Sequence, residues 1–209
     1  MGLNLDINLI IILAVSLISI IGFSRPTIIY RLQFNAWQIV NRHEYYRMLS
    51  YGLVHGSWMH LLINMFVLYS FGEAVLYYFK AAFDTGSAIR FLILFVSALV
   101  VSTLMTLLKE KDNPQYNAVG ASGAVSAVVF SSILFAPYNP ILFFGIIPIP
   151  GIIFGILYLV YSKYMAGKNV DNIGHDAHYY GALYGLIFPI LYEPSLAIHF
   201  FNRLMSFNF

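Results

Sequence analysis

Two short motifs in apolar sequence contain residues that could do chemistry together. In one, Ser122 lies between Gly120 and Gly123 at the start of an apolar segment. In the other, His178 opens a second apolar segment, about one helical turn before Gly181. An ionisable side chain in a membrane segment is costly, so it is by default a candidate functional residue. A histidine that meets a serine can remove the proton of the attacking hydroxyl, and the two motifs therefore predict nucleophilic chemistry below the membrane surface.

The composition indicates that these motifs belong to an integral membrane protein. The 209 residues are 60% hydrophobic and only 10% charged, with a mean hydropathy of +0.76, whereas about 25% of a soluble domain is charged. A net charge of +2 is too small to indicate a nucleic-acid partner. Because the chain has no cysteine, it cannot form a disulfide framework or a thiolate zinc site. We expect the lipid bilayer to surround most of the chain.

Six segments are long and apolar enough, or nearly so, to cross a membrane as helices, which takes about 20 residues. They cover residues 7–23, 58–79, 88–108, 122–136, 146–161 and 177–192. The first lacks the basic residues and the cleavage site of a signal peptide, so we interpret it as a retained span. After Pro194 too little sequence remains for a seventh span. The prediction is an all-α polytopic membrane protein with six transmembrane helices.

The connections between these segments differ in length and composition. The longest covers residues 24–57 and is rich in aromatic and arginine residues, which favours packing at the membrane interface. Four prolines interrupt the connection between the fourth and fifth segments: Pro137, Pro140, Pro148 and Pro150. No internal repeat is visible in the sequence, so we predict a single domain over residues 1–209.

The order of the segments predicts that four polar residues meet at one depth of the membrane. His60 and Asn64 lie near the start of the second segment, and Ser122 and His178 open the fourth and sixth. In an up-down bundle, all even-numbered helices start on the same side. His60 and Asn64 share one helix face because they are four residues apart, and both could donate hydrogen bonds to an oxyanion, as could the free N–H groups at Ser122. Gly120 leaves backbone room for a substrate.

Each of these features alone also has a purely structural explanation. The glycine-flanked serine could be a packing motif, and His60 with Asn64 could form an interhelical hydrogen bond. Gly181 and Gly185 form a small-xxx-small pattern that lets another helix approach closely, which would bring the serine within reach of the histidine. Three further residues border the candidate site and are more readily explained as loop structure: His55, His175 and Asp176. The joint pattern favours chemistry.

Three motifs together resemble the signature motifs of the rhomboid intramembrane serine proteases. They are His60-x-x-x-Asn64, Gly120-Ala121-Ser122-Gly123 and Ala177-His178-Tyr179-Tyr180-Gly181-Ala182-Leu183-Tyr184-Gly185, in the family's order. The resemblance implies a six-helix rhomboid-like bundle in which Ser122 and His178 form a catalytic dyad without an aspartate. It also implies an oxyanion site made by His60, Asn64 and the Ser122 backbone N–H, and neither a cofactor nor a metal.

The resemblance further implies what such a protein does and where. It would be a serine endopeptidase that cleaves single-span membrane proteins within or beside their transmembrane helices, as a multi-pass protein of the bacterial inner membrane. Its N-terminus would be cytoplasmic and its site would open outward. The positive-inside rule favours the opposite orientation, because this topology puts eight Lys and Arg residues outside and three inside. We expect the topology implied by the resemblance, since arginines of the first loop can have structural roles.

Two positions depart from the family pattern. Glu44-Tyr45-Tyr46-Arg47 resembles the Glu-x-Trp-Arg stretch of the rhomboid first loop, with Tyr46 in place of Trp. Four residues after the nucleophile, many bacterial relatives have a tyrosine that stacks on the catalytic histidine, whereas this chain has Ser126. The sequence therefore leaves open how His178 is held.

Four alternatives are compatible with the sequence. A catalytically inactive rhomboid-like protein would bind membrane proteins without cleaving them, although the intact serine and histidine argue against it. A small transporter or channel would be expected to have repeated halves, and no repeat is visible. Four histidines could form a metal site: His55, His60, His175 and His178. A catalytic triad would need Asp171 or Asp176 beside the histidine.

Overall fold

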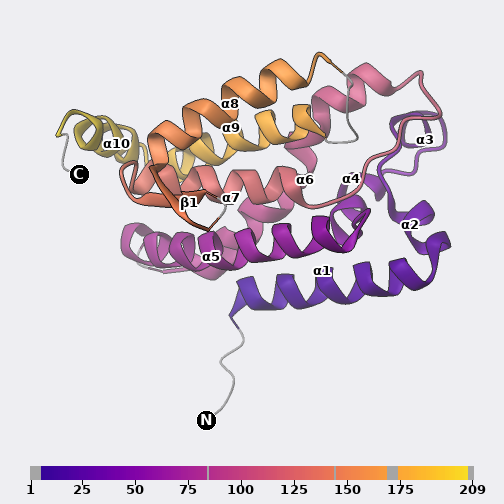
Figure 1. Ribbon diagram of the computed structural model, residues 1–209, viewed down its shortest axis with the longest axis horizontal. Helices are drawn as coiled ribbons and strands as arrows, with labels where there is room; N and C mark the ends of the chain where they lie inside the picture. Colours follow the sequence, from indigo (N-terminus) through magenta and orange to yellow (C-terminus); the bar gives the residue numbers. More distant parts are fainter. Residues whose placement is uncertain (1–5, 84, 144, 169–173, 207–209) are drawn as a thin grey trace, which may run out of the picture.

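Long apolar helices form a bundle in the computed structural model, which describes residues 6–83, 85–143, 145–168 and 174–206 (Figure 1). The helices that correspond to the expected spans are α1 (Ile7–Ser24), α5 (Trp58–Phe83), α6 (Ser87–Glu110), α7 (Ser122–Phe135), α8 (Gly151–Met165) and α9 (His175–Tyr192). The central helix is α7: it packs against α5, α6 and α9, and every residue in it after Ser122 is buried. Its Gly, Ala and Ser residues explain this position, because small side chains let neighbouring helices approach closely.

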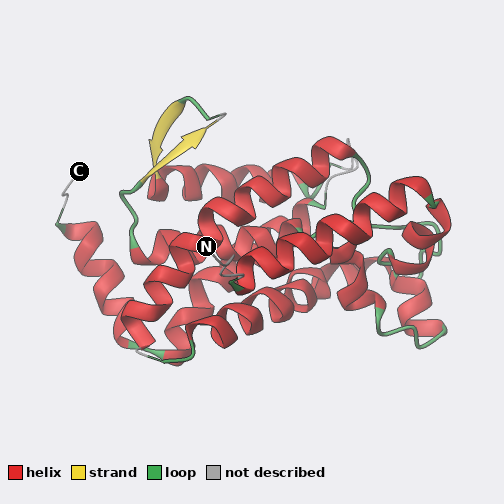
Figure 2. Cartoon of the chain, turned by 90° about the horizontal axis from the view of Figure 1, so that it is seen from below, coloured by secondary structure: helices red, strands yellow, loops and turns green. Residues whose placement is uncertain are grey.

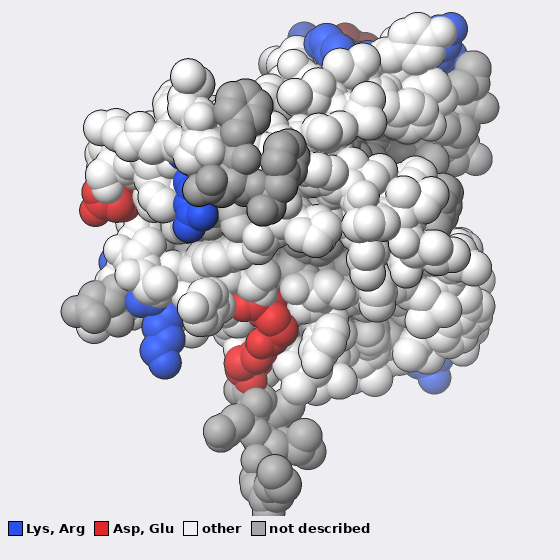
Figure 3. Space-filling model, turned by 60° about the vertical axis from the view of Figure 1, so that its left-hand side comes forward, with Lys and Arg blue, Asp and Glu red and all other residues white. Residues whose placement is uncertain are grey.

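The lengths and the surface of the helices fit a membrane. Among the described residues, α1, α5 and α6 are long and apolar enough to cross it alone, whereas α7 and α8 are shorter apolar helices. The pair of α9 and α10 (Ser195–Met205) passes the same test together but is bent by 119°. Large apolar side chains such as Leu17, Phe66 and Leu191 are exposed, and charged side chains are sparse on the face drawn in Figure 3. The all-α polytopic membrane fold is confirmed, while the count of six spans stays a prediction.

The fifth expected span, residues 146–161, begins too early. The start of this segment belongs instead to an antiparallel hairpin of β1 (Pro140–Phe143) and β2 (Ile147–Pro150), which projects from the helices in Figure 2. The helix α8 starts only after Pro150. Proline has no backbone N–H and fixes φ near about −65°, so Pro148 and Pro150 oppose internal helix positions and are tolerated in a two-stranded edge. The proline spacing therefore decides the secondary structure of this apolar segment.

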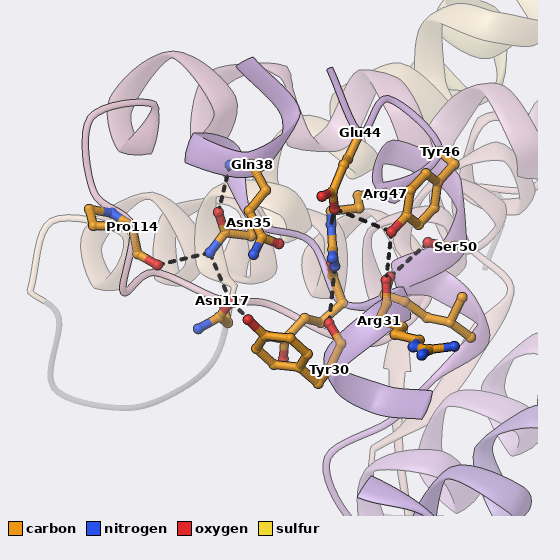
Figure 4. A network of polar contacts seen from close by, with 12 residues as sticks. Tyr30, Arg31, Asn35, Gln38, Glu44, Tyr46, Arg47, Ser50, Pro114 and Asn117 are labelled. Carbon is orange, nitrogen blue, oxygen red and sulfur yellow. Dashed lines mark hydrogen bonds and ion pairs between the residues drawn. The ribbon is translucent and has the colours of Figure 1, made fainter. Parts of the chain in front are cut away.

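The first loop folds into short helices around a buried arginine. They are α2 (Pro26–Leu32), α3 (Ala36–Asn41), α4 (Arg47–Ser50) and the 3-10 turn η1 (Tyr51–Leu53). Only 3% of Arg47 is exposed. Its Nε donates to Glu44 Oε2 at 2.6 Å, and its Nη1 donates to the carbonyl oxygens of Tyr30 at 3.1 Å and Gln33 at 2.8 Å (Figure 4). The hydrogen bond from this arginine holds the pKa of the Glu44 carboxyl below its ordinary value. One of the arginines counted toward the orientation of the chain is therefore a structural residue.

The first loop also holds the segment that leads into α7. Phe34 and Ala118 exchange backbone hydrogen bonds of 2.9 and 3.1 Å, and the Gly120 N–H donates to the Tyr51 carbonyl oxygen at 3.0 Å. The amide of Asn35 adds side-chain hydrogen bonds to the same segment (Figure 4). The chain therefore reaches the start of α7 along a backbone path that the first loop fixes.

Candidate functional site

The turn that precedes Ser122, the first residue of α7, lies directly against α5. Gly120 in this turn has a φ of +107°, a conformation that residues with a Cβ rarely adopt. A Cβ atom on Gly120 would also lie 2.5 Å from Cε1 and 2.7 Å from Nε2 of His60. Only glycine fits here, and the His60 ring covers the backbone two residues before Ser122. The structure thus brings the first two motifs together.

Asn64, about one turn after His60 on α5, carries an unpaired donor. It is 5% exposed, and its Nδ2 has no hydrogen-bond partner among the described residues. Buried polar groups are nearly always paired in folded proteins, so this amide has an unused hydrogen-bond donor on a helix that packs against α7. The first N–H groups of α7 are a second set of donors, because the first turn of a helix leaves them without intrahelical partners.

His55, which the sequence suggested to be loop structure, stands behind His60. Its ring is fully buried and packs edge-on against the His60 ring, with centroids 4.9 Å apart. Its Nδ1 is 2.9 Å from Ser19 Oγ, which in turn donates to the Leu53 carbonyl oxygen at 3.0 Å. Since the serine hydroxyl has only one proton, Nδ1 of His55 is the donor to Ser19. Residues of α1 and the first loop thus fix His60 from behind, and no local pattern in the sequence marks Ser19.

The contact between α9 and α7 is close enough at two glycines for backbone to touch backbone, and the Ser131 hydroxyl of α7 adds a buried hydrogen bond to the Gly185 carbonyl oxygen at 2.7 Å. A Cβ atom on Gly181 would overlap the carbonyl oxygen of Gly123, and one on Gly185 would overlap that of Ala127. Glycine is therefore required at both positions, which is the close helix approach that a small-xxx-small pattern allows.

This crossing places the neighbours of the two candidate catalytic residues against each other. The Ala177 carbonyl oxygen would lie only 3.2 Å from a Cβ atom on Gly123. These two residues directly adjoin His178 and Ser122, respectively. Between described residues, no hydrogen bond joins Ser122 Oγ to the His178 ring. Catalytic hydrogen bonds are often long before a substrate binds, and here the backbone contact is what brings the two residues to one place.

Tyr158 of α8 is a residue of this site that the sequence did not indicate. Its ring stacks on that of His178, with centroids 6.1 Å apart and an angle of 25° between the planes. Its hydroxyl is 2.6 Å from Ser126 Oγ, which donates to the Ser122 carbonyl oxygen at 2.8 Å. The tyrosine that stacks on His178 thus comes from α8, while position 126 on α7 carries a serine. No spacing could reveal this partner, because Tyr158 follows Ser126 by 32 residues and is one of 16 tyrosines.

The residues that border the site bear on two alternatives, a catalytic triad and a metal site. Asp176 accepts a hydrogen bond from Lys109 Nζ at 2.6 Å, and His175 packs edge-on against His178 with centroids 6.0 Å apart. Asp171, the other aspartate that a triad could use, lies outside the described residues. In the part of the chain that the structure describes, no group of three or more His, Asp or Glu residues could hold a metal ion. The arrangement combines a serine, a histidine and several hydrogen-bond donors around the start of α7.

Comparison with known protein families finds a match that covers most of the chain. The family model described as Rhomboid domain matches residues 42–194, which is more than half of the chain and includes every candidate site residue. A search of curated proteins finds no match. The family match agrees with the resemblance that the three motifs carry. The chain therefore belongs to the rhomboid family, whose members are in general intramembrane serine proteases.

Proposed function

We propose that this protein is an intramembrane serine endopeptidase with Ser122 as its nucleophile and His178 as its general base. The family supports this class of activity. The observation that carries the proposal is the start of α7. Here Ser122 follows a turn that packs against His60 of α5, the helix that also carries the buried amide of Asn64. The first turn of α7 also packs against α9, the helix that carries His178. The substrates are single-span proteins in the same bilayer.

In the first step, His178 takes the proton of Ser122 Oγ while this oxygen attacks the carbonyl carbon of the scissile peptide. The carbonyl oxygen becomes an oxyanion, which needs donors aimed at it in a site that excludes water. The Asn64 amide, the His60 ring and the N–H of Ser122 are the donors, and the bare backbone of Gly120 leaves room for the substrate.

In the second step, the imidazolium gives its proton to the leaving amine as the peptide C–N bond breaks, and an acyl ester remains on Ser122. A water molecule then attacks the ester while His178 takes its proton, and the proton returns to the serine oxygen as the ester bond breaks. The cycle consumes one water molecule and needs no cofactor.

The same chemistry limits the substrate. Peptide groups in a transmembrane helix are hydrogen-bonded and shielded from attack, so scissile segments need small residues and neighbours that destabilise the helix. The family resemblance favours the bacterial inner membrane as the location, with the site opening outward.

Incubation of the purified protein with a model single-span substrate tests the proposal. The wild type should cleave it, and Ser122→Ala should not, at an unchanged melting temperature because only one hydroxyl is lost. Ser132→Ala is the matched control, since this serine donates within its own helix, to the Val129 carbonyl oxygen. A fluorophosphonate probe should label Ser122 in the wild type. Labelling of Ser126 instead, or full activity of Ser122→Ala, would contradict the assignment.

The same experiment tests the alternative that the chain is a catalytically inactive rhomboid-like binding protein. Such a protein would bind the substrate without cleaving it, and its serine would not react with the probe. A small transporter or channel would likewise show no cleavage, but it would carry solute across liposomes.

A further inference from the structure

The ring of Tyr158 is itself held in place where it faces His178. It packs against Phe130 of α7, with centroids 5.6 Å apart, and against Phe154, one turn earlier on α8, with centroids 5.8 Å apart. These aromatic contacts restrict the tilt of the tyrosine ring, since such pairs have preferred geometries. His178 therefore faces a flat surface whose orientation is set by both α7 and α8.

The hydroxyl of Tyr158 is tied to the backbone of the candidate nucleophile. Ser126 has a single hydroxyl proton and gives it to the Ser122 carbonyl oxygen. Its oxygen must therefore accept the proton of the Tyr158 hydroxyl, 2.6 Å away. Ser126 is 6% exposed, so a loss of this bond would leave a nearly buried polar group unsatisfied. Two hydrogen bonds and one ring stack thus join Ser122 to His178 through Tyr158.

The rest of α8 shows how Tyr158 differs from the other residues of its helix. The buried residues of α8 are small: Gly151, Gly155 and Ser162. Large side chains such as Leu157, Val160 and Tyr164 are exposed. The core packs against three half-buried side chains of α8: Phe154, Tyr158 and Leu159. Of these three, only Tyr158 has a polar group, and its hydroxyl is 2.6 Å from Ser126 Oγ.

We propose that Tyr158 is a positioning residue that holds the His178 ring in the orientation needed to take the proton of Ser122. This inference rests on the proposed function, because it concerns the same reaction. The stack sets the plane of the imidazole, and the hydrogen bond to Ser126 sets the position of the stack. Tyr158 acts through His178 rather than on the substrate.

Loss of the ring should lower turnover without weakening substrate binding. Tyr158→Leu should lower kcat about 10- to 100-fold at an unchanged KM, because roughly 1 Å of misplacement can cost on the order of 100-fold. Tyr158→Phe keeps the stack and loses only the hydroxyl bond, so its kcat should stay within about tenfold of the wild type. Ser126→Ala removes this bond and also its own hydrogen bond to the Ser122 carbonyl oxygen, so it should lower kcat at least as much as Tyr158→Phe. The double variant should lose no more than Ser126→Ala alone, because the bond between the two side chains is already absent there.

The matched control is Tyr164→Leu, the same change on the same helix at a residue that is 60% exposed. For each variant we would also measure the melting temperature and the rate at which diethyl pyrocarbonate modifies His178, read by mass spectrometry. Tyr158→Leu should raise this rate several-fold because one face of the imidazole loses its cover. Tyr158→Phe and Tyr164→Leu should leave it unchanged. This rate requires no catalytic activity, so it tests the stack independently of the proposed function.

The outcomes separate the two proposals. In each variant, kcat is calculated per site that the fluorophosphonate labels at Ser122. If the wild type cleaves and Tyr158→Leu has the same kcat as Tyr164→Leu, the positioning role is overturned. A Tyr158→Leu protein that melts lower and binds substrate less tightly, while His178 reacts at the wild-type rate, overturns it too and makes Tyr158 a packing residue. A wild type that neither cleaves nor reacts with the fluorophosphonate refutes the proposed function, and the modification rates then still decide whether Tyr158 holds His178.

Discussion

The helix crossing and the first loop hold the start of α7 from two sides by opposite kinds of contact. At the crossing, Gly181 and Gly185 of α9 bring backbone against backbone, because neither residue has a Cβ atom. At the first loop, polar groups around Arg47 and the bridge between Phe34 and Ala118 hold the chain just before α7. The two regions should therefore respond differently to substitution.

The two regions should respond differently because a substitution disrupts close backbone packing and a polar network in different ways. Closely packed backbones have no room for an added atom, and overpacking shifts the elements themselves. A substitution in a polar network removes one hydrogen bond at a time, and each lost bond costs about 1 kcal/mol of stability. If the bond to Glu44 is lost, Arg47 still donates to the carbonyl oxygens of Tyr30 and Gln33. Substitutions at the helix crossing should therefore lower turnover, whereas substitutions in the first loop should mainly lower stability.

The largest effect is expected for the base that α9 carries. His178→Ala should lower turnover on the order of 10,000-fold or more, and adding Ser122→Ala should cost little further, because residues that act as a unit are non-additive. Turnover of both variants and of the double variant checks this. Asp176→Ala is the control, since Asp176 pairs with Lys109. An equal loss of turnover in a folded Asp176→Ala protein would contradict the dyad.

The next largest effect is expected at Asn64 of α5, a helix that packs against α7. Asn64→Ala should lower turnover about 100- to 1,000-fold, as removal of one oxyanion donor does. The melting temperature should not fall, because the Asn64 Nδ2 has no partner among the described residues. Kinetics with a single-span substrate measure this, with Ser70→Ala as the control, since Ser70 donates only to its own helix at Phe66. Weaker substrate binding at unchanged turnover would make Asn64 a substrate-binding residue.

The crossing itself can be broken with a single methyl group. Gly181→Ala should lower both turnover, by up to about 100-fold, and the melting temperature, because its Cβ overlaps the Gly123 carbonyl oxygen. Gly155→Ala is the matched control: its Cβ would lie 3.4 Å from both Ile133 Cδ1 and Phe130 Cε1, which are ordinary contacts. The exchange also favours helix by up to about 1 kcal/mol. Thermal unfolding in detergent and cleavage assays of both proteins decide the matter. A Gly181→Ala protein that melts and cleaves like the wild type would refute the backbone contact.

The smallest effect is expected in the first loop. Glu44→Gln should lower the free energy of unfolding by about 1 kcal/mol, because nearly buried Arg47 keeps an acceptor but loses its charged partner. Turnover should stay close to that of the wild type. Because Arg47 holds the pKa of Glu44 below its ordinary value of 4.5, this stabilisation is present above pH 4.5 and is lost as the pH falls through the lowered pKa.

Melting temperatures at neutral and acid pH check this prediction. The difference between wild type and Glu44→Gln should shrink in acid, and Asp112→Asn, a change at an exposed residue, should show no such difference. A large loss of turnover in Glu44→Gln at an unchanged melting temperature would mean that the loop acts on the chemistry rather than on stability.

The sequence by itself determined the features that depend on local pattern. Apolar runs predicted α1, α5, α6, α7 and α9 close to their observed bounds, because about 20 apolar residues have few alternatives to a helix in lipid. The glycine spacing at Gly181 and Gly185 predicted a close helix approach, since only the absence of a Cβ permits it. The order of the motifs predicted that Ser122, His60 and His178 belong to one site.

Other features were decided by tertiary structure alone. The sequence shows Arg47 only as a cation in a loop, but in the structure it is 3% exposed. Its guanidinium can be buried because it donates hydrogen bonds to the carbonyl oxygens of Tyr30 and Gln33, 17 and 14 residues earlier in the chain. His55 supports His60 only because α1 presents Ser19 to it. Tyr158 meets His178 only through the rotation of α8 about its own axis and its placement against α7 and α9. That geometry results from packing among several helices at once, and no spacing along one segment of the chain encodes it.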